Sequence, residues 1–414
     1  MPQPTVKDQL NGYLLSWPDV SITVKRVRIH KSDDRVTGEI LIQSTTDEGK
    51  IITLTPPTLF NFSADRTRKE QAKNLSLKYP KLNWAEIIDQ LCDIVQERAR
   101  RGEPVLELWT SEENIKPPEP LLWPILYKGL PTVIFGDKGV AKSTFALGLY
   151  FCLLLPWTAN PLGLKAPDRC IQTLILDWET EGDIVQYYGK LIQEGHNLPA
   201  VPILYRRCGL PLADDLEQIQ SHILDTKAEA IIIDSLGAAA GGELKNPEVA
   251  LNFFTGLRQL KVGSLIIAQN SKDPETKKKS IFGSTYFSYY SRNIFELCKA
   301  ETLDENDIDI ALFHRSINIG KTQKPMSFRL HYNETGLKFE RQPFDIAEFL
   351  EKVSNISKVL EALKHGALSV DDLSKACGLK KEATQVILSR LKAKDQAIQT
   401  ERGIWGLKVR ENIS

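Results

Sequence analysis

The chain has 414 residues, of which 42% are hydrophobic and 26% are charged, and its 53 Lys and Arg residues balance 53 Asp and Glu residues. This composition is ordinary for a globular protein and excludes a disordered chain, a collagen and a coiled-coil rod. The length predicts two or three domains, because single hydrophobic cores stop growing near ~250–300 residues. The net charge of zero gives no indication of a nucleic-acid partner, so any basic surface must be local.

The cysteine pattern and the apolar runs indicate where the protein works. The six cysteines form no CxxC pair, and four of them lie in apolar or helix-like runs. We therefore expect free thiols, no structural zinc and a cytoplasmic location. The first ten residues lack the apolar stretch of a signal peptide. The longest apolar run, 145–157, is too short to span a bilayer, so we expect no membrane segment.

Residues 1–115 are expected to form an N-terminal α+β domain. Alternation of apolar and polar residues predicts three strands, over 21–29, 36–42 and 51–54. Two helices are predicted to follow. The first covers 64–77, with Ser63 as its N-cap, and the second covers 84–101, where apolar residues recur at helical spacing.

A proline cluster at 116–120 marks the start of a second domain, which we expect to cover 116–345. Here short β-branched runs alternate with helical stretches, and this alternation predicts an α/β fold with a mainly parallel sheet and helices on both faces. The predicted strands are 131–135, 172–177, 230–234, 264–269 and 308–314. Residues 346–414 form a small third unit.

The strongest motif is a Walker A phosphate loop between a strand and a helix. Its residues are Gly136, Asp137, Lys138, Gly139, Val140, Ala141, Lys142, Ser143 and Thr144. The backbone N–H groups of such a loop hold the phosphates of ATP, Lys142 would reach the β- and γ-phosphates, and the Ser143 hydroxyl would bind Mg²⁺. Ala141 stands where the motif has its second glycine, and it fits there if its φ is negative.

Two acidic strand ends complete the expected site. The apolar run 229–235 predicts a Walker B strand, so that Asp234 would hold Mg²⁺, usually through water. The run 174–181 is a strand that ends in acids, and with it the chain resembles the RecA/DnaB superfamily. The resemblance implies a glutamate that polarises the attacking water. Glu179 fits that role best, and Glu181 is the alternative.

The same resemblance assigns roles further along the chain. Gln269 ends a strand and would sense the γ-phosphate. The following loop would face the channel of a ring, where Lys277, Lys278 and Lys279 would contact DNA phosphates, although three lysines can equally be a solvated loop. A basic residue after the last core strand would act across a subunit interface. Arg315 is the candidate and Lys321 is the alternative. The segment could also be a surface hairpin without a catalytic role.

The run of 282–285 and the helix that follows resemble RepA-type hexameric helicases of plasmids, phages and mobile elements. The C-terminal unit, predicted as three helices and a hairpin, resembles a winged helix. From residue 351 onward, 12 Lys and Arg residues face 8 Asp and Glu residues, a net charge of +4. The third helix would enter a DNA major groove, although many winged helices bind protein instead. Its candidate DNA contacts are Lys380, Lys381, Thr384, Gln385 and Arg390.

These resemblances imply an ATP- and Mg²⁺-dependent helicase or translocase that acts on DNA during replication of a plasmid, phage or mobile element. It would assemble as a homo-oligomeric ring, with a hexamer expected, on single-stranded DNA and with double-stranded DNA as a second ligand. The alternative is an ATP-switched DNA-binding or loader protein that hydrolyses ATP slowly. A recombinase-type filament is less favoured, because no polymerisation segment is recognisable.

Overall fold

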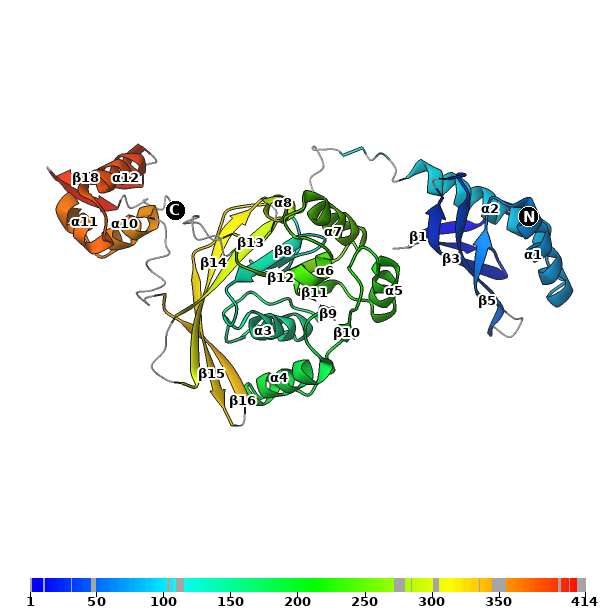
Figure 1. The fold of residues 1–414 in the computed structure, drawn as a ribbon, viewed down its shortest axis with the longest axis horizontal. Helices are drawn as coiled ribbons and strands as arrows, with labels where there is room; N and C mark the ends of the chain where they lie inside the picture. The colour runs from blue at the N-terminus through cyan, green and yellow to red at the C-terminus, as the bar shows by residue number, and fades with distance from the viewer. Residues whose placement is uncertain are drawn as a thin grey trace.

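The computed structural model describes residues 2–9, 12–30, 32–45, 50–102, 105, 107–108, 115–271, 280–283, 285–300, 305–334, 336–344, 355–393, 396–401 and 403–407. Figure 1 shows an N-terminal unit, a large central unit and a small C-terminal unit in chain order. All six cysteines lie in the described ranges and carry free thiols. No helix in these ranges is long and apolar enough to cross a membrane.

The N-terminal unit is an antiparallel sheet covered by helices. Its described strands, in their order across the sheet, are β1 (Thr5–Gln9), β2 (Gly12–Ser16), β3 (Val20–Ile29), β4 (Val36–Thr45) and β5 (Ile51–Asn61). The helices are α1 (Asp65–Lys78) and α2 (Trp84–Arg101). Alternate residues of β3 and β4 are buried in a core that α2 completes with Trp84, Ile87 and Leu91.

Both predicted helices of this unit are present, but the predicted cap of the first is wrong. The N-cap of α1 is Ala64, and the Ser63 hydroxyl instead accepts a hydrogen bond from the backbone N–H of Val36 at 2.9 Å. Asn83 caps α2 by accepting from the backbone N–H of Glu86. Strands β1 and β2 were not predicted; β1 is polar and largely exposed.

The central unit is built on a sheet of mixed direction. Its strands are β8 (Pro131–Gly136), β9 (Thr173–Asp177), β10 (Tyr205–Arg207), β11 (Ala230–Asp234), β12 (Gly263–Gln269), β13 (Asn293–Ala300), β14 (Asp307–Ile317), β15 (Met326–Asn333) and β16 (Gly336–Gln342). Their order in the described residues is β10-β9-β11-β12-β8-β13-β14-β15-β16. The pairs from β10 to β13 are parallel, and the pairs from β13 to β16 are antiparallel.

The predicted mainly parallel sheet is therefore confirmed, as is each of the strands predicted for this unit. Strands β10, β13, β15 and β16 were not predicted. A small hairpin, β6 (Pro120–Leu122) and β7 (Leu126–Tyr127), leads into β8.

Helices cover both faces of this sheet (Figure 1). The helices of the central unit are α3 (Lys142–Leu154), α4 (Gly182–Gly195), α5 (Leu216–Thr226), α6 (Leu236–Ala240), α7 (Pro247–Gln259) and α8 (Thr285–Tyr290). Ile232 of β11 packs in the apolar cluster with α3 and α4, whereas Ile231 and Ile233 pack in the cluster with α5 and α7. Strands buried on both faces read as continuous apolar runs, as these do.

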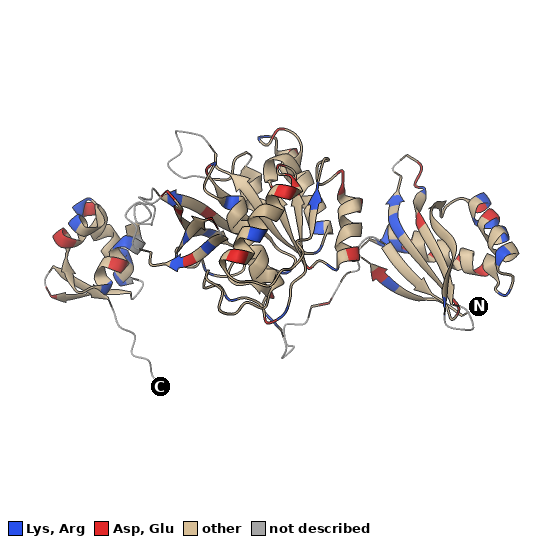
Figure 2. Ribbon diagram, turned by 90° about the horizontal axis from the view of Figure 1, so that it is seen from below, with Lys and Arg blue, Asp and Glu red and all other residues tan. Residues whose placement is uncertain are grey.

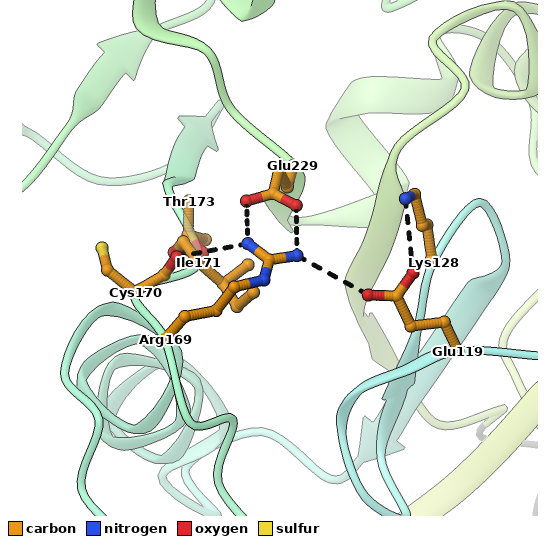
Figure 3. A network of polar contacts seen from close by, with 7 residues as sticks. All are labelled: Glu119, Lys128, Arg169, Cys170, Ile171, Thr173 and Glu229. Carbon is orange, nitrogen blue, oxygen red and sulfur yellow. Dashed lines mark hydrogen bonds and ion pairs between the residues drawn. The ribbon is translucent and has the colours of Figure 1, made fainter.

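A surface network joins three segments at the amino ends of the parallel strands (Figure 3). The Arg169 guanidinium, just before β9, binds the Glu229 carboxylate, just before β11, with one bond of 2.7 Å. Arg169 also lies 3.6 Å from Glu119, which pairs with Lys128 at 3.3 Å. Nearly half of the Arg169 side chain is exposed, so the network adds little to the stability of the fold.

The C-terminal unit contains the helices and the hairpin that were predicted for it. Its described elements are α10 (Asn355–Lys364), β17 (Leu368–Ser369), α11 (Val370–Cys377), α12 (Lys381–Ala393), β18 (Ala397–Glu401) and β19 (Ile404–Leu407). One predicted DNA contact is wrong, because Thr384 is fully buried and its hydroxyl donates to the Lys380 carbonyl at 3.2 Å. Thr384 lies on the same face of α12 as the buried Leu388 and Leu391.

The end of α4 packs against the β15–β16 hairpin through two glycines. A Cβ atom on Gly195 would lie 2.4 Å from the Leu337 carbonyl oxygen, and one on Gly336 would lie 2.5 Å from the Gly195 nitrogen. Next to this contact, His196 Nε2 accepts a hydrogen bond from the Phe339 N–H at 2.8 Å. Burial lowers the pKa of His196 to about 4, so the ring is neutral and can accept this bond. The antiparallel extension of the sheet is thus fixed to α4.

We predict that Gly195→Ala lowers the free energy of unfolding by about 1–3 kcal/mol, because the new methyl group overlaps a backbone carbonyl that cannot move freely. Gly320→Ala is the matched control, since a Cβ there meets no atom within 4 Å. Urea unfolding followed by circular dichroism measures both. Equal stability of the two variants would show that α4 and the hairpin do not approach this closely.

Candidate nucleotide site

The phosphate loop connects β8 to α3 at the carboxyl edge of the sheet. Asp137, Lys138 and Gly139 are exposed, whereas Val140 is buried and anchors the loop. The loop leads into the N-terminus of α3, where backbone N–H groups and the helix dipole favour an anion. The Lys142 ammonium donates to the backbone carbonyls of Gly136 at 3.0 Å and Asp137 at 2.7 Å. The loop thus presents the donors that bind phosphate.

Ala141 adopts a conformation that the sequence did not predict. Its φ is 61° and its ψ is 32°, in the left-handed region, so the expectation of a negative φ is wrong. A residue with a Cβ costs about 1–2 kcal/mol in that region, and glycine adopts it freely. The loop therefore keeps the shape that the motif's second glycine would give, at a conformational cost that Ala141 adds.

The acidic partners of the loop come from neighbouring parallel strands. Asp234 ends β11, its Cα pairs with that of Asp177 at the end of β9, and it accepts a hydrogen bond from the Ser143 hydroxyl. Glu179 follows β9, and its Oε1 accepts a hydrogen bond from the Ser235 hydroxyl. The Lys142 ammonium interacts electrostatically with Asp234, Asp137 and Glu179. Residues far apart in the sequence thus lie around the Lys142 ammonium.

Glu179 and Glu181 face different partners. Glu181 is the N-cap of α4, is largely exposed, and forms an ion pair with Arg207 at 3.3 Å. Glu179 lies near Lys142 and Asp234. The geometry therefore favours Glu179 over Glu181 as the acid beside the phosphate loop.

Burial controls the charge of the site. It raises the pKa of Asp234 to about 6, with Asp177 and Glu179 raising it further and with Ser143 and Lys142 opposing the shift. Burial also lowers the pKa of Lys142, although the surrounding carboxylates oppose this. An 8%-exposed carboxylate beside a hydroxyl and two further carboxylates is an oxygen-rich, electron-rich set. That set fits a hard divalent cation such as Mg²⁺, and the loop fits the phosphates of a nucleotide.

The predicted sensor residue Gln269 pairs through its backbone with Gly136. Among the described residues it is the side chain of the neighbouring Asn270, not that of Gln269, that bonds to the loop. Gln269 is exposed at the end of β12, and its carbonyl accepts a hydrogen bond from the Phe282 N–H at 2.9 Å. Asn270 is buried and donates from Nδ2 to Asp137 Oδ1 at 2.9 Å, whereas its own Oδ1 has no partner among the described residues. Sequence analysis missed Asn270. The feature that could have indicated it is its position directly after β12, the strand that pairs with β8.

Among the described residues, neither Arg315 nor Lys321 bonds to the phosphate loop. Arg315 lies in β14, donates from Nε to Glu296 Oε2 at 2.7 Å, and covers the Phe313 ring at 4.6 Å. Arg315 is exposed, and its strand β14 forms an antiparallel hairpin with β13. Lys321 is exposed beyond β14. The lysines at 277–279 lie outside the described residues.

The candidate contacts in the C-terminal unit are mostly on its surface. Lys380, Gln385 and Arg390 are exposed, and Lys381 is exposed and paired with Asp371 at 2.8 Å. Basic and acidic residues are interspersed on all three units in Figure 2. The structure therefore presents these cations without a separate block of positive charge.

We predict that Asp234→Asn stabilises the protein in the absence of nucleotide and Mg²⁺. The pKa of Asp234 is about 6 in the folded state against 3.8 for an ordinary Asp, so ionisation opposes folding above pH 6. The gain at pH 7.5 is at most about 3 kcal/mol, at about 1.4 kcal/mol per pKa unit. It should shrink as the pH falls from 6 to 4, because the folded wild-type carboxyl then takes up a proton.

Urea unfolding at pH 7.5 and pH 4.5 in EDTA measures this effect. Asp214→Asn, at an exposed position, is the control and should change little at either pH. A destabilised Asp234→Asn protein at pH 7.5 would contradict the idea that the buried charge opposes folding.

Comparison with known proteins agrees with this geometry for part of the chain. The model of an AAA domain family matches residues 96–273, which include the phosphate loop, Glu179 and Asp234. No curated protein matches the chain. Among the matching solved structures is a KaiC-like protein of the hyperthermophilic archaeon Pyrococcus horikoshii OT3, with 16% identity, 55% of this chain and 98% of that chain covered, and a TM-score of 0.36. That TM-score is too low to support an argument. The family match, the mainly parallel sheet and the phosphate loop together support a RecA-like P-loop ATPase core.

Proposed function

We propose that the protein binds ATP with Mg²⁺ and hydrolyses it, and that hydrolysis drives its action on DNA as a RepA/DnaB-like helicase or translocase. The proposal includes replication of a plasmid, phage or mobile element, a cytoplasmic location and a homo-oligomeric ring, with a hexamer expected. One observation carries it: Lys142, Ser143, Asp234 and Glu179, from three separate parts of the chain, meet at the carboxyl edge of the sheet. That set provides phosphate binding, metal binding and a carboxylate for water.

The chemistry follows from the side chains. Ser143 and Asp234 would hold Mg²⁺, which would neutralise charge on the phosphate oxygens when bound. The loop N–H groups would hold the phosphate chain, and Lys142 would exchange its contacts with the Gly136 and Asp137 carbonyls for phosphate oxygens. Glu179 would orient a water molecule and accept its proton. Asn270 is placed to report changes at the loop, because its side chain bonds to Asp137.

Exposed aromatic and basic side chains support DNA as the partner. Tyr289 is 70% exposed on α8 and packs edge-on against the partly exposed Tyr286. In the sequence both follow shortly after Lys277–Lys279. Aromatic faces beside lysines are the features that bind single strands by stacking and phosphate contact. The exposed cations of α12 support duplex binding by the C-terminal unit as a winged helix.

A second candidate is an ATP-switched DNA-binding or loader protein with slow hydrolysis. Arg315 favours it, because this candidate for action across a subunit interface is paired with Glu296 of its own chain. An isolated subunit would then lack the extra cation that speeds phosphoryl transfer. ATPase rates with and without single-stranded DNA, measured beside particle size, separate the two: strong stimulation in a ring supports the motor.

We predict that Lys142→Ala abolishes ATP hydrolysis without unfolding the protein, because it removes the charge that holds the β- and γ-phosphates. Glu179→Gln should keep nucleotide affinity and lower turnover by about 10²–10⁴-fold, the usual contribution of a general base. Glu181→Gln is the matched control and should turn over normally. Phosphate release and binding of a fluorescent nucleotide give the two readouts. Normal turnover by Lys142→Ala would exclude the phosphate-loop assignment.

We predict that replacing Lys277, Lys278 and Lys279 with alanine weakens single-strand binding and removes DNA stimulation of the ATPase. Each lost phosphate contact should flatten the log–log salt dependence of binding by about 0.7. Duplex binding by the C-terminal unit should persist. Replacing Lys69, Lys73 and Lys78, which are exposed on α1, controls for the loss of net charge. Unchanged single-strand affinity at every salt concentration would leave the lysine segment as a solvated loop.

A further inference from the structure

The hydroxyl of Ser235 has an unusual partner. Ser235 directly follows Asp234, is 4% exposed and is the N-cap residue of α6. A serine at an N-cap usually accepts a hydrogen bond from a backbone N–H of the first turn. Here the side chain makes no such capping bond, and its hydroxyl donates to Glu179 Oε1 instead. Ser235 thus does not cap α6 with its side chain and instead contacts Glu179, which follows β9.

The backbone of Glu179 is fixed from a second direction. Asp177 is 1% exposed, and its Oδ1 accepts hydrogen bonds from the backbone N–H groups of Glu179 and Thr180, both at 2.8 Å. The Trp178 N–H donates to the Asp234 carbonyl at 2.7 Å. The turn after β9 is therefore attached to the end of β11. Because the backbone of Glu179 is fixed, only its side-chain torsions remain to be set. The side chain itself is exposed.

We propose that Ser235 is a positioning residue that sets the orientation of the Glu179 carboxylate. This inference rests on the proposed ATP hydrolysis. Ser235 engages Oε1, and Oε2 accepts no hydrogen bond from the residues that the structure describes. One oxygen is thereby held while the other is left to accept the proton of a water molecule. A flexible glutamate would otherwise lose side-chain entropy each time it adopted that orientation.

The position of Ser235 also links Asp234, the proposed metal ligand, to Glu179, the proposed base. The same peptide segment carries Asp234, which would bind Mg²⁺, and the donor that orients Glu179. A change in the backbone at Asp234 is therefore transmitted to Glu179 over one residue. Residues in such contact are expected to be energetically coupled.

Ser235→Ala tests the inference through kcat and KM. Without the donor, kcat should fall about 10–100-fold, the range expected when a catalytic group loses its orientation, while KM and nucleotide affinity stay unchanged. Ser235→Thr keeps a hydroxyl and should restore most of kcat. Ser264→Ala is the control for loss of a buried serine. The Ser264 hydroxyl donates to the Val262 carbonyl at the amino end of β12, away from the phosphate loop. The kcat of Ser264→Ala should therefore not change.

A second readout needs no nucleotide. The shift in urea midpoint caused by Glu179→Ala should be more destabilising when Ser235 is present than when it is alanine. Additive midpoint shifts together with an unchanged kcat in Ser235→Ala would overturn the inference, and so would failure of Ser235→Thr to restore kcat. An inactive wild-type protein would instead overturn the proposed hydrolysis. If Ser235→Ala fails to fold, the threonine variant and its midpoint shifts still decide.

Discussion

The site depends on the register of four parallel strands that are buried on both faces. Strands β8, β12, β11 and β9 are neighbours, with Gly136 paired to Gln269 and Asp234 paired to Asp177. Helices cover both faces, so polar side chains of these strands can reach solvent only at the strand ends. The carboxyl ends of parallel strands meet at one edge, and ligands bind there in open α/β sheets. The phosphate loop, the metal-binding carboxylate and the candidate base are neighbours for this reason.

This edge is energetically unfavourable by itself, and the rest of the fold supports it. Asp234 is a buried carboxylate with a raised pKa, and Ala141 holds a left-handed conformation. Such features persist where the surrounding structure fixes them. Here that support is α3, whose residues from Phe145 to Leu154 are all buried between the sheet, α4 and the β15–β16 hairpin. The contact between Gly195 and Gly336 that attaches this hairpin to α4 therefore matters for the site as well as for stability.

Features that depend on composition and spacing, such as the core strands and the phosphate loop, could be predicted from the sequence. The direction in which a single side chain points could not. Apolar runs and the loop motif were enough for the core strands and for the residues around Lys142. Strands β15 and β16 carry an alternation of apolar and polar residues that was an available signal for strands, and it was missed. Strand β13 was missed as well. The resemblance implied Gln269, and the bond from the Asn270 side chain to Asp137 was not predicted, because a sequence does not show which of two adjacent side chains turns toward the loop. Thr384 was a polar residue on the buried face of its helix, where spacing to Leu388 and Leu391 was the available signal.

The three cations considered for the site, Lys142, Arg315 and Lys321, differ in what their movement would leave behind. Lys142 is held by neutral carbonyls, which water can satisfy when the ammonium moves to a phosphate. Arg315 is held by Glu296, whose side chain is only 4% exposed and also accepts a hydrogen bond from the Cys298 thiol. The departure of Arg315 would leave this buried carboxylate without a cation. Because the Arg315 side chain is 36% exposed, the cost of breaking this pair is lower than the cost of about 3–5 kcal/mol for a fully buried one. Lys321 is exposed and makes no ion pair with the described residues, so it could reach a neighbouring subunit without that cost. Arg315 therefore primarily stabilises its own sheet, whereas the side chain of Lys321 is not held in this way.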